Sequence, residues 1–154
     1  MEKSQIKKII ISVVVIALVA GLGSVFVNLG MDWFNSLQKP TQWVPNIVIP
    51  IVWTVVYLAF GVINFFWFKC EDVPTPTIIL MLINAVLNVL WCLTFFTLKQ
   101  LLLGNIVILL NLIAGVVLVV NIFQNKKLFG CVLSIYPIWL SIATTLNLAL
   151  WILN

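Results

Sequence analysis

Tryptophan, tyrosine and asparagine side chains recur inside long apolar runs of this sequence, where leucine would be the simpler residue. An amide buried in hydrocarbon needs a hydrogen-bonding partner, and an indole ring needs a shaped neighbour or cavity. Because every lysine and every acidic residue lies outside these runs, the pattern predicts a pocket for an uncharged-to-polar aromatic ligand and no ion path. The candidate ligand-binding residues are Trp53, Tyr57, Asn84, Asn88, Trp91, Trp139, Ala143 and Asn147.

Helical spacing gathers these side chains into stripes on three of the runs. The stripes consist of Trp53, Tyr57, Gly61 and Asn64, then Asn84, Asn88, Trp91 and Phe95, and finally Trp139, Ala143 and Asn147. A rise of about 1.5 Å per residue places their overlap in the half of a bundle nearest segment 28–46, so a pocket there would open toward that segment. From the residues alone, helix packing explains the stripes as well as a pocket does. Asn105, Asn111 and Asn121 on the fourth run are expected only to cross-link helices.

Composition identifies an integral membrane protein. Of the 154 residues, 64% are hydrophobic and 8% are charged, and the mean hydropathy is +1.24, which excludes an ordinary soluble domain. The net charge of +4 comes from lysines beside the runs, so it indicates membrane topology and no nucleic-acid partner. The absence of histidine and the wide spacing of the cysteines predict no metal site and no required cofactor.

Five runs are long enough to cross a membrane as helices, since each holds about 20 residues. The predicted spans are Ile9–Val27, Ile47–Phe68, Thr77–Leu98, Leu101–Phe123 and Leu128–Leu153. The first is kept as a span because it exceeds a signal peptide's apolar stretch and has no clear A-x-A site. The longest remaining segment has about 19 residues, so we expect one transmembrane domain over 1–154, an all-α five-helix bundle.

The lysines set the expected orientation. The N-terminus and the segments 69–76 and 124–127 share one side and hold six lysines, whereas the other side holds only Lys39 and Lys99. The positive-inside rule then places the N-terminus in the cytoplasm of a bacterial plasma membrane.

The connector 28–46 is too apolar to lie freely in water. It reads NLGMDWFNSLQKPTQWVPN, and we expect it to fold over the end of the bundle as a short amphipathic helix followed by a proline-stiffened return. Such a segment is expected to anchor the protein at the membrane interface, and the functional interpretation is that it also forms a lid.

The chain resembles the tryptophan-rich sensory protein/translocator protein family (TspO/MBR), also called peripheral-type benzodiazepine receptors. The resemblance runs from about residue 21 to the end. Its motifs are Trp33-Phe34, Leu37, Lys39-Pro40 and Pro45; Pro50-x-Val52-Trp53-Thr54-x-x-Tyr57 with Gly61; Leu82-x-Asn84-x-x-x-Asn88-x-x-Trp91 with Phe95-Phe96; Pro137-x-Trp139-x-x-x-Ala143-Thr144-x-x-Asn147; and Trp151 with Asn154.

The resemblance implies a five-helix bundle, commonly a homodimer, that binds porphyrins such as protoporphyrin IX and isoquinoline or benzodiazepine drugs. Motif matching puts Trp53, Asn84, Trp139 and Ala143 on the family's ligand-pocket positions. Bacterial relatives are linked to light- and oxygen-dependent porphyrin breakdown, in which the residues at Trp53 and Trp139 are implicated. An excited porphyrin beside an oxidisable indole supports radical chemistry without a catalytic acid, base or metal.

Two positions depart from the family pattern. The motif K-P-x-W/F-x-P-P stands here as Lys39-Pro40-Thr41-Gln42-Trp43-Val44-Pro45, so that Gln42 replaces the aromatic residue and Val44 replaces the first proline of the lid motif. Animal members carry a C-terminal cholesterol motif with a tyrosine and a basic residue, and 146–154 has neither. Cholesterol binding is therefore not carried over.

Three functions compete on these observations. The first is a receptor or sensor for a porphyrin-like ligand, with a role in porphyrin transport or regulation. The second is an enzyme that degrades protoporphyrin IX photochemically through Trp53 and Trp139. The third, an ion-coupled transporter, ranks last because coupling needs an ionisable residue inside a span and none is present. Passive translocation of the ligand is compatible with the sequence.

Overall fold

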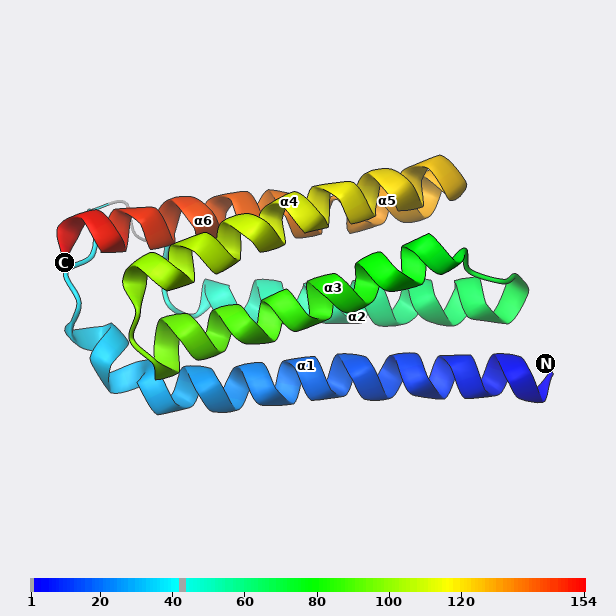
Figure 1. Cartoon of the computed structure of the whole chain (residues 1–154), viewed down its shortest axis with the longest axis horizontal. Coiled ribbons are helices and arrows are strands. Elements are labelled where there is room, and N and C mark those ends of the chain that lie inside the picture. Colours follow the sequence, from blue (N-terminus) through cyan, green and yellow to red (C-terminus); the bar gives the residue numbers. More distant parts are fainter. Residues whose placement is uncertain (1, 42–43) are drawn as a thin grey trace.

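The computed structural model describes residues 2–41 and 44–154, and these form a bundle of nearly parallel and antiparallel helices. Its elements are α1 (Lys3–Ser36), α2 (Val48–Cys70), α3 (Thr75–Cys92), the π-helical segment η1 (Leu93–Thr97), α4 (Leu101–Asn125), α5 (Lys127–Leu133) and α6 (Ile135–Leu153). Five helical segments of the described part are long and apolar enough to cross a membrane, which confirms the predicted all-α, five-helix membrane bundle. The two termini lie at opposite ends of the bundle (Figure 1).

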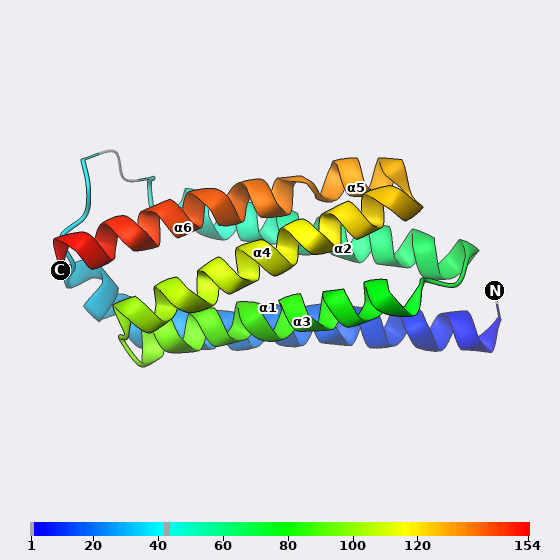
Figure 2. The same ribbon diagram turned by 45° about the horizontal axis from the view of Figure 1, so that its top comes forward.

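The central helix of the bundle is α4, which packs against α3 on one side and α6 on the other, while α1 packs on α2 and on α3 with η1. Figure 2 shows α4 crossing obliquely over its neighbours. In the most apolar part of α1 only 11% of the residues are buried, against 39% in α4. The exposed valines, isoleucines and leucines of α1 therefore face lipid rather than a protein core.

The first helix is longer than the predicted span Ile9–Val27, because α1 continues to Ser36 through the first nine residues of the predicted connector. Gly30 allows this continuation: a Cβ on Gly30 would lie 2.2 Å from the carbonyl oxygen of Phe96 in η1. Thr97 donates its hydroxyl hydrogen to the Phe26 carbonyl at 3.1 Å and ties η1 to the same stretch. The expected separate amphipathic helix is thus the end of α1, bent toward the C-terminal end of α6 (Figure 1).

The remaining connector, residues 37–47, is fastened to the C-terminal end of α6. The backbone N–H of Gln38 donates to Oδ1 of Asn154 at 2.9 Å, and Nδ2 of Asn154 donates to the Gln38 carbonyl at 3.1 Å. The ammonium group of Lys39 lies 4.7 Å from the ring centre of Phe34. The departure from the family motif at Gln42 and Trp43 lies outside the described residues, so lid geometry there stays a prediction.

The fifth predicted span is found as Lys127–Leu153, but it is divided at Ser134 into α5 and α6 rather than forming one regular helix. Pro137 has no N–H to donate to the Leu133 carbonyl. In addition, the Ser134 N–H bonds the Cys131 carbonyl, three residues back rather than four, at 3.3 Å. The third span also departs from a uniform helix: in η1 the Leu98 N–H reaches back five residues to the Leu93 carbonyl at 2.9 Å. Lys99 then turns the chain toward α4 with φ 57°.

Two hydrophobic clusters fill the described part of the bundle, one near each membrane surface. The cluster on the side of the C-terminus contains Trp53, Trp91 and Trp139, and the cluster on the side of the N-terminus contains Trp67 and Phe68. Amides of α4 bridge helices as predicted: Tyr136 lies 3.1 Å from Asn111 Oδ1, Thr77 donates to Asn121 at 2.6 Å, and Asn105 donates to the Asn147 carbonyl at 3.3 Å.

Candidate functional site

Trp53 lies at the centre of a group of aromatic rings contributed by α2, α3 and α6. Its ring centre is 5.7 Å from that of Tyr57, at an interplanar angle of 26°, and 6.0 Å from that of Trp91, at 31°. Tyr136 presents its edge to Trp53 at 6.4 Å. Trp139 belongs to the same buried cluster. We call Trp53, Tyr57, Trp91, Tyr136 and Trp139 the aromatic cluster; side chains predicted from three separate runs do meet there.

Four buried N–H groups have no hydrogen-bond acceptor among the described residues. One is Nδ2 of Asn111, and the three nearer the connector are Nε1 of Trp91, Nε1 of Trp139 and Nδ2 of Asn147. A buried polar group without a partner costs about 1–3 kcal/mol. The three nearer the connector are donors, so the group that satisfies them must offer acceptors such as carbonyl or carboxylate oxygens. Asn147 and Ala143, both buried, extend the Trp139 face along α6.

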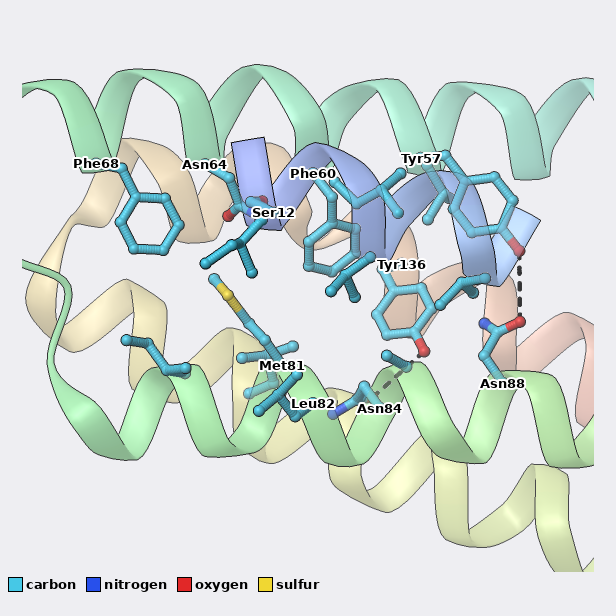
Figure 3. Close-up of a pocket in the computed structure, with 18 of the residues that line it drawn as sticks. Ser12, Tyr57, Phe60, Asn64, Phe68, Met81, Leu82, Asn84, Asn88 and Tyr136 are labelled. Atoms are coloured by element: carbon cyan, nitrogen blue, oxygen red, sulfur yellow. Dashed lines mark hydrogen bonds between the residues drawn. The ribbon is translucent and has the colours of Figure 1, made fainter. Parts of the chain in front are cut away.

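A cavity of about 270 Å³ lies beside the aromatic cluster, in the half of the bundle that holds the N-terminus. Figure 3 shows it between α1, α2 and α3, with Tyr136 reaching in from α6. We call it the inner cavity. Of the predicted ligand-binding residues, Tyr57, Asn84 and Asn88 line it.

The other predicted residues, Trp53, Trp91, Trp139, Ala143 and Asn147, do not line the inner cavity. The sequence predicted an opening near the connector, at the level of the indole rings. At that level the rings pack on one another, whereas smaller side chains such as Ser12 and Ala85 face the space nearer the N-terminus. The void therefore lies on the opposite side of the aromatic cluster from the connector.

At the boundary between the aromatic cluster and the inner cavity, two tyrosine hydroxyls donate hydrogen bonds to asparagine carboxamide oxygens. Tyr57 Oη lies 3.4 Å from Asn88 Oδ1, and Tyr136 Oη lies 3.3 Å from Asn84 Oδ1; Figure 3 shows both pairs. The Asn84 amide also donates Nδ2 to the Leu80 carbonyl at 2.9 Å. The carboxamides thus fix the tyrosines, which in turn contact Trp53.

Sequence reasoning missed Tyr136 and Ser12. Tyr136 lies one helical turn before Trp139, so extending the α6 stripe past Pro137 would have found it. Ser12 is the one hydroxyl in the uncharged stretch 9–23 of α1, and no other side chain of that stretch is polar. Its companion is Asn64 of α2, whose Nδ2 donates to the Ser12 hydroxyl at 2.8 Å.

Comparison with known proteins decides the family. The model of the TspO/MBR family matches residues 11–152, nearly the whole chain. The chain belongs to the TspO/MBR family. This membership confirms the resemblance and agrees with the five membrane-spanning segments.

Three relatives show how the similarity extends over whole chains. The tryptophan-rich protein TspO of Archaeoglobus fulgidus is 28% identical, over 97% of this chain and 99% of the relative. The human translocator protein is 30% identical, over 84% of this chain and 80% of the relative. Protein CrtK of Rhodobacter capsulatus is 26% identical, over 79% and 78%. These TspO/MBR proteins match the bundle as a whole rather than one helix of it.

Proposed function

We propose that this TspO/MBR protein is a membrane receptor or sensor for a porphyrin-like tetrapyrrole such as protoporphyrin IX. The ligand lies against the aromatic cluster, beneath the connector 37–47. The observation that carries the proposal is the set of three unpartnered donors, on Trp91, Trp139 and Asn147, around the indole rings of the aromatic cluster. A flat conjugated ring suits the indoles, and carboxylate oxygens at its edge suit the donors.

The route to this site passes the connector. Trp33 and Leu37, at the end of α1, pack against the hydrophobic core that contains the aromatic cluster, and the ring of Trp33 contacts that of Phe95. A tetrapyrrole does not enter through the inner cavity, because that cavity has a volume of about 270 Å³. Pockets for drug-sized ligands begin at roughly 300 Å³, and a tetrapyrrole needs more space than that. A tetrapyrrole therefore enters by displacing residues 37–47, and the Gln38–Asn154 contact holds the entrance closed.

The test is a titration of the detergent-solubilised protein with protoporphyrin IX, followed by quenching of tryptophan fluorescence. We expect Trp139→Ala to weaken binding at least several-fold, because aromatic stacking contributes about 0.5–1.5 kcal/mol beyond the buried area. The matched control is Trp67→Ala, which removes an equally buried indole from the other hydrophobic cluster and leaves the affinity unchanged. Equal affinity of wild type and Trp139→Ala would remove Trp139 from the site.

Photochemical porphyrin breakdown is a second candidate, favoured by the contacts of Trp53 with Trp91, Tyr57 and Tyr136. Such a row of oxidisable rings passes an electron to an excited porphyrin while oxygen serves as the final oxidant. Under this function the porphyrin bands decline in light and oxygen but persist in the dark or under argon. Trp53→Phe and Trp139→Phe abolish the decline without abolishing binding, whereas a simple receptor bleaches at the same rate in all three proteins.

We place the protein in a bacterial plasma membrane with its N-terminus in the cytoplasm, on the strength of the lysine distribution. Cys70 is exposed at the end of α2, on the side of the N-terminus. A membrane-impermeant maleimide should therefore label Cys70 only after the cells are permeabilised, whereas Lys99→Cys, at the opposite end, is labelled in intact cells. The reverse pattern would invert the topology. Isoquinoline and benzodiazepine binding and a homodimer are proposed on the family resemblance.

A further inference from the structure

The inner cavity is open toward lipid and adjoins the proposed tetrapyrrole site, with Tyr57 and Tyr136 between the two. Its lining residues Ile11 of α1 and Leu82 of α3 are 52% and 49% exposed, so the cavity reaches the lipid-facing surface between these two helices. Its other walls include Phe60, Phe68 and Met81 (Figure 3). A molecule dissolved in the bilayer therefore has a lateral entrance that does not pass the connector.

Among the polar side chains that line this cavity, Asn64 carries a buried atom without a hydrogen-bond partner among the described residues, and the residue is only 7% exposed. Its Nδ2 is used by Ser12, and its Oδ1 has no partner among the described residues. The Ser12 hydroxyl can equally donate to Oδ1 if the amide is turned over, which leaves Nδ2 free instead. A ligand hydroxyl satisfies either orientation, because it both donates and accepts.

Charge at the cavity is already neutralised. Lys8 lies at its margin, and its ammonium group is paired with the carboxylate of Asp72 in the α2–α3 loop. Asn84 and Asn88 also line the cavity, but their carboxamide oxygens are occupied by the hydroxyls of the two tyrosines. The other walls are apolar side chains apart from the hydrogen-bonded Ser12 and Asn64. The chemistry of the lining therefore suits a neutral molecule with one hydroxyl group.

The size of the cavity limits the ligand further. An apolar protein cavity of about 150 Å³ holds benzene, so a cavity of about 270 Å³ holds a molecule of roughly ten non-hydrogen atoms. The open side lets a longer chain extend into the membrane. We propose that the inner cavity is a second ligand site that takes an aliphatic alcohol from the bilayer, with its hydroxyl on Asn64 and its chain between Phe60, Phe68 and Met81.

Photolabelling of the full chain in lipid nanodiscs tests this site. A ten-carbon primary alcohol with a diazirine on its chain is irradiated with the protein, and the labelled residues are mapped by mass spectrometry. We expect labels on Met81, Phe60 and Phe68. Excess 1-decanol should suppress them at concentrations at which decane does not. The glycerol ester of decanoic acid, tested in parallel, shows whether a free alcohol or the hydroxyl of a lipid headgroup is preferred.

Two variants separate the hydroxyl contact from the space. Asn64→Leu removes the amide and should weaken competition by 1-decanol several-fold, in keeping with the roughly 0.5–1.5 kcal/mol of a hydrogen bond. Ala85→Leu fills the cavity and should abolish labelling of its walls while Asn64 remains. Asn125→Leu, an exposed amide at the end of α4, is the matched control and labels like the wild type.

The outcomes are distinct from those of the porphyrin titration. Asn64→Leu and Ala85→Leu should retain wild-type porphyrin affinity, because both residues line the inner cavity and neither belongs to the aromatic cluster. Decane competing as well as 1-decanol would identify a cleft for acyl chains and overturn the proposal. Labels spread over lipid-facing side chains in all variants would also overturn it. If Asn64→Leu does not fold, labelling of the cavity walls in Ala85→Leu still shows whether the alcohol binds in the inner cavity.

Discussion

Gln38 and Asn154, 116 positions apart in the sequence, form a reciprocal pair of hydrogen bonds between the connector and the last residue described. The backbone of Gln38 supplies both a donor and an acceptor, and the carboxamide of Asn154 supplies the complements. A carboxamide suits this role because it presents an acceptor and a donor side by side. The α1–α2 connector is therefore held by the far end of the chain.

Replacement of Asn154 by alanine should loosen the connector. Two hydrogen bonds of about 0.5–1.5 kcal/mol each are lost, and both lie at an exposed site, so we expect cleavage by proteinase K within residues 37–41 to accelerate several-fold. Porphyrin association and dissociation should accelerate together, with little change in affinity. Thr145→Ala, an exposed change on the same helix, serves as the control. Unchanged cleavage in Asn154→Ala would show that other contacts hold the connector.

Two glycines of α1 predict opposite effects of the same substitution. Gly30→Ala forces a methyl group against the Phe96 carbonyl, 2.2 Å away, and should destabilise the fold by about 1–3 kcal/mol. Gly21→Ala meets nothing within 4 Å, and alanine favours helix over glycine by up to about 1 kcal/mol. Thermal unfolding in detergent should place the melting temperature of Gly30→Ala below the wild type and that of Gly21→Ala level with it or above. Equal values for the two variants would contradict the close α1–η1 contact.

Removal of the Tyr136 hydroxyl should cost more stability than removal of the Tyr57 hydroxyl. Tyr136→Phe strips a buried partner from Asn84 and Asn111, and a buried amide left unpaired costs about 1–3 kcal/mol. Tyr57→Phe removes one longer contact, at 3.4 Å, from Asn88. Chemical denaturation of both variants in the same detergent measures the difference. A larger loss in Tyr57→Phe would shift the structural role to the Tyr57–Asn88 pair.

Acid should weaken the contact between α1 and the α2–α3 loop. The hydrogen bond from Lys8, together with its positive charge, lowers the pKa of Asp72 below its ordinary value. A carboxyl group with a lowered folded-state pKa adds stability above its unfolded-state pKa, about 3.9, and loses that contribution as the pH falls through the lowered value. Wild-type protein should therefore lose stability below about pH 4, and Asp72→Asn should lose less over the same range. Parallel pH profiles for the two proteins would contradict this role.

The architecture followed from the sequence because long uncharged runs permit only helices in a membrane, where each backbone N–H and C=O must bond internally. The end of α1 was misjudged because Asp32 and Trp33 resemble connector residues. Contact with η1, which no periodicity reveals, keeps them helical. The π-helical turn and the break at Ser134 likewise depend on neighbours and on local hydrogen bonds rather than on composition.

The grouping of Trp53, Trp91 and Trp139 was predictable because a stripe at helical spacing faces one neighbour. The position of the inner cavity was not. An empty volume depends on the differences in size between side chains of separate helices, here Ala85 and Ser12 against the large rings of the aromatic cluster. Whether the predicted residues bind a ligand stays a prediction, which the two tryptophan variants address.

The π-helical turn η1 holds one residue more than an α-helical turn of the same length, and one residue corresponds to about 100° of rotation. Two adjacent phenylalanines thereby serve different neighbours: the Phe96 backbone seats Gly30 of α1, while the Phe95 ring seats Gly104 of α4, where a Cβ would come within 2.8 Å. The extra residue of η1 can in principle be removed without interrupting the helix. Deletion of a single residue from 93–97 would restore a regular pitch, and it would leave one of these two glycines facing the wrong partner.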